Sequence, residues 1–141
     1  MSLFTKKQFT ILPGLLILSA VVVSCTQEPS VEQARADLCR DLAELQQNLA
    51  ALEAISPNSS IGDLKQAKAD VAESFKKVQA AREEVEEAKI EELEVAHTDL
   101  ETAVSKISEK DSIADAAGSV QPEVQKVEAA RAQLFSTVKC Q

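Results

Sequence analysis

Residues 38–52 read LCRDLAELQQNLAAL, and five leucines divide this stretch into steps of four, three, four and three residues. On an α-helix these steps place every leucine on one face, a pattern typical of a coiled coil or helical bundle. Ser30, with Gln33 three residues later, forms a capping box and predicts where the helix begins. The stretch ISPNSS at 55–60 predicts a turn at its end, and Ser60, with Asp63 in the first turn that follows, is the expected cap of the next helix. The leucines are Leu38, Leu42, Leu45, Leu49 and Leu52.

Residues 61–107 predict one long helix, because neither glycine nor proline occurs between Gly62 and Gly118. The step from Val85 to Leu93, which joins two apolar stripes, is eight residues rather than seven, and we expect the helix to absorb it by a local change in winding or by changing which partner it faces. Unbroken, this helix would be about 70 Å long at about 1.5 Å per residue. The stripes are Leu64, Val71, Phe75, Val78 and Val85, then Leu93, Leu100, Val104 and Ile107.

The polar residues 108–112, SEKDS, predict a turn, and after it a third apolar register continues to Val138 through Gly118 and Pro122. Since proline is tolerated in the first turn of a helix, we expect a short helix near 112–117, a kink and a main helix near 120–139. The sequence therefore predicts an all-α fold, an elongated antiparallel three-helix bundle with a long central helix. Small residues on the predicted helices favour close helix approach without an internal cavity. These are Ala67, Ala72, Ala96 and Ala103.

The first 24 residues have the organisation of an export signal, ahead of a helical domain at 31–141. Lys6 and Lys7 supply positive charge, and residues 11–23 form an uncharged apolar run. This run is too short to cross a bilayer as a helix, which needs about 20 residues. It fits the core of a signal peptide.

The residues that end this run resemble the lipobox of bacterial lipoproteins, which are cut before an invariant cysteine. The resemblance implies removal of residues 1–24, a diacylglyceryl thioether on Cys25, and usually an acyl chain such as palmitate on its new amine. Residues 25–30 would then carry the lipid and form a short tether. An ordinary cleaved secretory signal and an uncleaved anchor are the alternatives. The lipobox residues are Val22, Val23, Ser24 and Cys25.

The same resemblance implies a cell-envelope location, with the body facing away from the cytoplasm. Thr26 follows the cysteine, where aspartate is the usual retention signal. This favours the outer membrane in a bacterium with two membranes and the cell membrane otherwise. The membrane is thus one expected partner, reached through the lipid on Cys25, since several acyl chains together anchor a protein stably.

The charge of the body restricts its other partners. The chain has 15 basic and 23 acidic side chains, and removal of Lys6 and Lys7 with the leader leaves a net charge of −10. Such a surface repels nucleic acid phosphates and anionic lipid head groups. Phe75 and Phe135 are the only aromatic residues after the leader, which leaves little surface for stacking bases. We therefore expect no nucleic acid partner.

Two cysteines, Cys39 and Cys140, remain after Cys25. In an exported protein they favour one disulfide. Counting along the helices from the predicted turns places both beside about residue 77–79 of the long helix. Two free thiols, or dimerisation through either one, are the alternatives.

Candidate sites for chemistry are sparse. Glu94 stands three residues before His97, the spacing found in di-iron bundles, but such sites need two of these motifs and this is the only histidine. We therefore predict no metal and no cofactor, and interpret His97 as a boundary residue beside a solvated acidic face. That face carries Glu83, Glu87, Glu91 and Glu94. Basic residues near the seams either pair with acids or mark a protein interface; they are Arg35, Arg82, Lys89 and Arg131.

The sequence has no serine with a histidine partner at a recognisable spacing and no glycine-rich phosphate loop, so we do not expect an enzyme. We expect a membrane-anchored envelope lipoprotein whose non-catalytic helical module is structural or an adaptor for another envelope protein, presented as a rigid rod close to the bilayer. The alternative is a binding protein for a small ligand or cation held between helices. It predicts a cavity of several hundred Å³ in the bundle.

Overall fold

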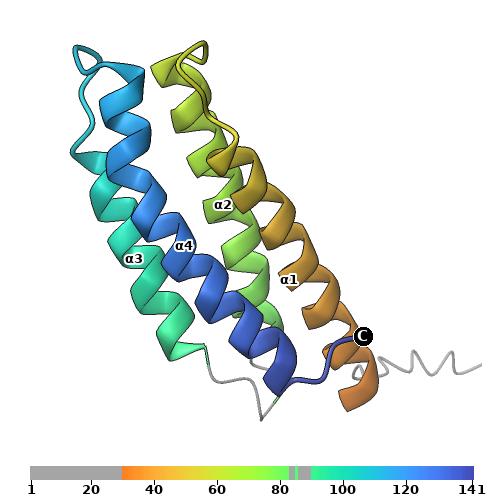
Figure 1. Ribbon diagram of the computed structural model, residues 1–141. Coiled ribbons are helices and arrows are strands. Elements are labelled where there is room, and N and C mark those ends of the chain that lie inside the picture. Colours follow the sequence, from red (N-terminus) through yellow and green to blue (C-terminus); the bar gives the residue numbers. More distant parts are fainter. Residues whose placement is uncertain (1–29, 83–84, 86–89) are drawn as a thin grey trace, which may run out of the picture.

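The computed structural model describes residues 30–82, 85 and 90–141, which fold into four α-helices without a strand (Figure 1). The chain runs up and down alternately, so each helix is antiparallel to the one before it. α1 packs along α2, α3 packs along α4, and α1 joins the two pairs through α4. The predicted all-α bundle is confirmed. The helices are α1 (Val31–Glu53), α2 (Ile61–Arg82), α3 (Glu91–Ser105) and α4 (Ile113–Thr137).

The expected three-helix arrangement with a long central helix is wrong. α2 ends at Arg82 and α3 begins at Glu91, and the chain reverses direction between them. Val85 and Ile90 in this connection are both buried. The eight-residue step between the two apolar stripes therefore marks a reversal and not a change in winding. One continuous helix would extend beyond the end of α1 and leave its second stripe in water, whereas the reversal buries both stripes in one core.

The predicted break near Pro122 is also wrong, because α4 continues through it as one helix. Proline lacks the N–H that would bond the carbonyl of Gly118, and its ring crowds that carbonyl. Both residues face solvent, so water can bond the carbonyl that has lost its donor. The apolar register on the opposite face is continuous, and its burial outweighs the local cost.

Three helices begin after a serine that caps them. Ser30, Ser60 and Ser112 each accept a hydrogen bond from the backbone N–H three residues later, at 3.2, 3.1 and 3.1 Å. At Ser60 the capping box is complete, since its own N–H donates to the Asp63 carboxylate at 2.7 Å. These hydrogen bonds hold the pKa of Asp63 below its ordinary value. The predicted helix start at Ser30 and the cap at Ser60 are confirmed.

The core is a column of leucine and valine side chains that runs the length of the bundle. All five leucines of the opening stretch are buried, with exposures of 0–3%. Each of the other helices contributes its own stripe to the same column. Besides α1, the stripes are Leu64, Val71, Phe75 and Val78 in α2; Leu93, Ala96, Leu100 and Val104 in α3; and Ala116, Val120, Val124, Val127 and Leu134 in α4.

Candidate functional site

The two body cysteines form a disulfide. Cys39 lies in α1, and Cys140 lies just beyond the end of α4, with their Cα atoms 5.5 Å apart. This pairing was predicted and is confirmed, but the arrangement of helices that brings the two cysteines together differs from the predicted one. Three helices would have made the first and last parallel, whereas the additional reversal makes α4 antiparallel to α1. The C-terminus thereby returns to the end of the bundle where α1 begins (Figure 1).

A tight turn after α4 presents Cys140 to α1. The N–H of Cys140 donates to the carbonyl of Phe135 at 3.1 Å, and the N–H of Lys139 donates to that of Ser136 at 3.1 Å. These two bonds form a Schellman motif. Lys139 occupies the left-handed position with φ 58°, where glycine is usual. Because lysine and not glycine occupies this position, the turn could not be predicted from the sequence.

One basic seam residue lies inside the bundle near this turn. Arg131 is 8% exposed, and its guanidinium carbon lies 5.8 Å from the centre of the Phe135 ring. Burial lowers the pKa of Arg131 from its ordinary value, and the charge of Glu128 partly offsets this. Its Nε has no hydrogen-bond partner among the described residues. Arg131 is thus a largely buried cation whose methylene chain packs in the seam.

The only histidine lies at the α2–α3 interface, where the helices approach less closely than within each pair. The His97 ring stacks on Phe75 with the ring centres 4.0 Å apart and an interplanar angle of 11°. Its exposure is 7%, and desolvation lowers its pKa; Glu101 raises the pKa and Lys68 lowers it further. His97 is therefore held neutral against an aromatic face, more deeply buried than the boundary position predicted for it.

Acidification should destabilise the protein through His97. The pKa of His97 lies below 6.5 in the fold. The unfolded chain, at about 6.5, therefore binds the proton first, and stability falls as the pH drops through 6.5. We expect the urea midpoint to decrease between pH 7.5 and pH 5.5. His97→Phe keeps a ring for stacking and should flatten this dependence. An equal slope in the variant would assign the effect to other groups.

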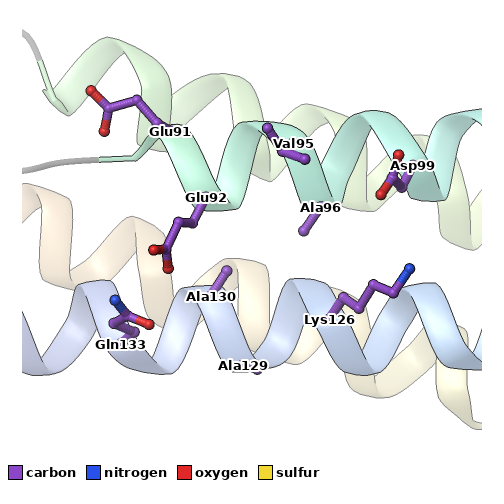
Figure 2. A pocket seen from close by; sticks show the side chains of 9 residues that line it. All are labelled: Glu91, Glu92, Val95, Ala96, Asp99, Lys126, Ala129, Ala130 and Gln133. Carbon is purple, nitrogen blue, oxygen red and sulfur yellow. The ribbon is translucent and has the colours of Figure 1, made fainter.

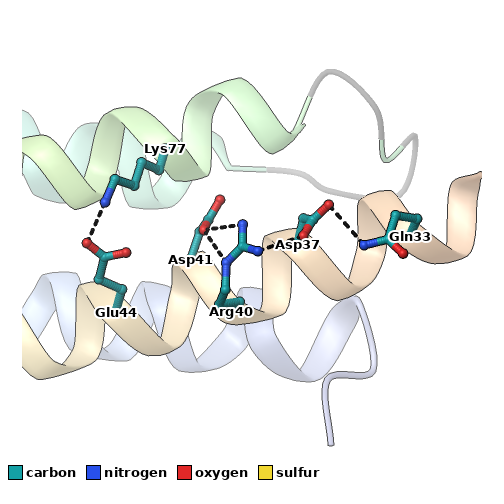
Figure 3. Close-up of polar contacts among 6 residues, drawn as sticks. All are labelled: Gln33, Asp37, Arg40, Asp41, Glu44 and Lys77. Carbon is teal, nitrogen blue, oxygen red and sulfur yellow. Dashed lines mark hydrogen bonds and ion pairs between the residues drawn. The ribbon is translucent and has the colours of Figure 1, made fainter. Parts of the chain in front are cut away.

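Polar side chains join α1 to α2 along their outer seam (Figure 3). Lys77 of α2 forms an ion pair with Glu44 of α1 at 2.6 Å. Nearby on α1, Arg40 bonds Asp37 at 2.8 Å and the buried Asp41 at 3.2 Å. The Lys77–Glu44 pair links the two helices, whereas the bonds of Arg40 lie within α1. Exposed ion pairs of this kind each contribute about 0–1 kcal/mol to stability.

The outer seam between α3 and α4 is built differently. Among the described residues no side-chain hydrogen bond or ion pair joins the two helices. A groove of about 500 Å³ opens between them to solvent (Figure 2). Its alanines let the backbones approach but do not fill the outside of the seam. The groove is lined by Glu91, Glu92, Val95, Ala96, Asp99, Lys126, Ala129, Ala130 and Gln133.

The candidate metal-site residues are not assembled into one centre. Glu94 accepts hydrogen bonds from Arg82 at 3.0 Å and from Gln79 at 3.2 Å, whereas His97 stacks on Phe75. In the part of the chain that the structure describes, no three histidine, cysteine or acidic residues gather as metal ligands. Glu83, Glu87 and Lys89, like the lipobox and Cys25, lie outside the described residues.

The alternative of a ligand held between helices predicted an internal cavity. Two hollows among the described residues, of about 500 and 630 Å³, lie on the surface and open to solvent. A small-molecule site normally encloses 70–90% of its ligand. These open grooves suit a macromolecular partner better. Sequence reasoning missed the α3–α4 groove, and its only sequence signal was the pair Ala129–Ala130 opposite Ala96.

None of the four described helices is both long enough and apolar enough to cross a membrane. Comparison of the chain with known protein families, with curated proteins and with solved structures found no match. Any functional assignment must therefore be argued from the residues themselves.

Proposed function

We propose that this chain is a lipoprotein of the bacterial cell envelope, anchored by lipid on Cys25, and that its helical body is a non-catalytic structural or adaptor module. The outer membrane is the proposed location in a bacterium with two membranes, and the cell membrane otherwise. The proposal rests on two independent features of the chain. These are the lipobox-like end of the leader and the disulfide of the body.

The Cys39–Cys140 disulfide is the observation that supports export most strongly. It joins residues 101 positions apart, and persistent disulfides of this structural kind belong to oxidising compartments. A leader of two lysines and an apolar run supplies the route to such a compartment. The leader and the disulfide thus both favour export, although they are separate features of the chain.

The geometry of the bundle suits a short tether. α1 begins at Val31, and the C-terminus and disulfide lie at this same end (Figure 1). The five residues 26–30 span at most about 17 Å, so this end would lie near the bilayer. α4, the longest helix with 25 residues, is about 37 Å long. The proposed module is therefore a compact bundle about half as long as the 70 Å rod that the sequence suggested.

Replacing the proposed lipidation site tests this function. We expect Cys25→Ser to move the protein from the membrane fraction to the soluble fraction or to leave it as an uncleaved precursor, because no acyl chain can be attached to serine in this way. Ser24→Ala, which keeps a small residue before the cysteine, is the matched control and should stay anchored. Mass spectrometry of the anchored protein should find residues 1–24 absent and lipid on Cys25.

The opposite result is equally clear. If Cys25→Ser is cleaved as before and sediments with membranes as firmly as the unaltered chain, lipid on Cys25 is not the anchor. The adaptor role at a fixed distance from the bilayer would then lose its basis.

A further inference from the structure

The α3–α4 groove is part of a longer surface. A second hollow follows on the same outer seam, toward the turn between α3 and α4, and includes Ala103, Ile107 and Ala116. Asp99 in the first hollow and Ala103 in the second lie one helical turn apart on α3. The two hollows therefore lie end to end along the seam, parallel to the helices, and are together called the channel.

The floor of this channel is apolar. The buried Ala96, the half-buried Ala130 and the exposed Ala129 form it, and beside them the Val95 side chain is 62% exposed. Within the described residues the only other large apolar side chain so exposed is Val31, at 61%, near the proposed tether. The alanines leave room for the side chains of another helix to reach the seam.

The rims of the channel are acidic. The two hollows together are lined by six acidic and two basic side chains. Lys126 is already paired with Glu123 at 2.8 Å, and this pairing, with a smaller contribution from the charge of Asp99, raises the pKa of Lys126. Glu91 and Glu92 also stabilise the N-terminus of α3, but Asp99 lies in the middle of that helix and has no such role. An apolar floor with acidic rims is complementary to a cationic amphipathic partner.

We propose that this channel binds an amphipathic helix of another envelope protein, one with a narrow apolar edge flanked by lysine or arginine. A helix laid in a groove makes contact through residues at steps of three and four, which matches the narrow, straight floor. A second copy of this chain would bring together two bodies that each carry −10, and anionic lipid head groups are repelled in the same way. This proposal deepens the adaptor role and rests on it, because it names the partner class.

Photocrosslinking in intact cells of the source organism tests the channel. A benzophenone amino acid is placed in the full chain at Val95 and, as a matched site of equal exposure outside the channel, at Val31. We expect Val95 to yield an adduct with a different protein that Val31 does not give. Peptide mapping of the adduct should place the crosslink in a segment with an apolar stripe and flanking lysine or arginine residues.

The acidic side chains at the rims of the channel provide a second test of the proposal. Glu91→Gln, Glu92→Gln and Asp99→Asn together should reduce the Val95 adduct by about fivefold or more, because the electrostatic attraction is lost. The control removes the same number of charges from exposed positions on α1 and α2, and should leave the yield unchanged; it combines Glu32→Gln, Glu53→Gln and Glu73→Gln. Retention of the Cys39–Cys140 disulfide verifies that each variant folds.

Several results would overturn the channel proposal. They are a Val95 adduct made of two copies of this chain, an adduct with lipid, a mapped segment without basic residues, and the absence of any Val95-specific adduct. An adduct yield indifferent to the rim charges would do the same. If any one of these results is found while the unaltered chain stays membrane-anchored through Cys25, the docking proposal is wrong but the proposed function is unaffected. If membrane anchoring does not depend on Cys25, the proposed function fails as well.

Discussion

Removing the Cys39–Cys140 disulfide should lower the free energy of unfolding by about 4–5 kcal/mol, as the chain-entropy model gives for a closed loop of about 100 residues. The crosslink joins positions 101 apart and thus encloses most of the body. Without it the unfolded chain gains the conformational freedom that the crosslink removed. At about 4–8 °C per kcal/mol for a domain near this size, Tm should fall by about 20 °C or more. Since domains are stable by only about 5–15 kcal/mol, this is a large share.

The measurement compares urea unfolding of the oxidised chain with that of Cys39→Ser/Cys140→Ser. The double variant is preferable, because a single substitution leaves a free thiol that can form dimers. Adding reductant should bring the unaltered protein to the midpoint of the double variant and leave the double variant unchanged. Digestion without reductant should recover the peptides of Cys39 and Cys140 as one linked species. Equal midpoints with and without reductant would mean that the disulfide does not stabilise this fold.

Leu42→Ala should have the second-largest effect, a loss of about 2–5 kcal/mol. Leu42 is fully buried near the middle of α1, the helix that packs against both α2 and α4. Truncation removes buried apolar surface and leaves a cavity between helices that the disulfide holds near one end. Alanine favours the helix itself, so the loss measures packing and not helix propensity.

Val31→Ala is the matched control for this substitution. Val31 lies on the same helix but is 61% exposed, so its truncation should change stability by less than about 0.5 kcal/mol. Chemical unfolding of both variants with the disulfide intact gives the comparison. If Leu42→Ala cost no more than Val31→Ala, the leucine seam of α1 would not form the core.

Local signals along the chain predicted most of the elements. The leucine spacing in α1, the capping serines Ser30 and Ser60 and the turn at 55–60 each depend on residues a few positions apart, and the structure has all of them. The turn between α3 and α4 was likewise marked by polar residues. Helical periodicity and capping are properties of a single helix, so no knowledge of the partner helices was needed.

The reversal between α2 and α3 could not be predicted in this way. Residues 83–89 are mostly glutamate, alanine and lysine, which favour helix, and contain neither glycine nor proline. The only trace of the reversal was the eight-residue step from Val85 to Leu93. That step is compatible with a change in winding or with a turn, and the choice depends on what the second stripe packs against.

The sequence by itself determined that the body is helical, where three of its helices begin and which faces are apolar, and it favoured a disulfide between Cys39 and Cys140. Tertiary packing alone decided that there are four helices, that α4 runs antiparallel to α1, that His97 stacks on Phe75, and that an acidic channel lies open between α3 and α4. The physical reason is the distance along the chain over which each interaction acts. Periodicity and caps are set within one or two helical turns, whereas the number of reversals is set by how much apolar surface all helices can bury together.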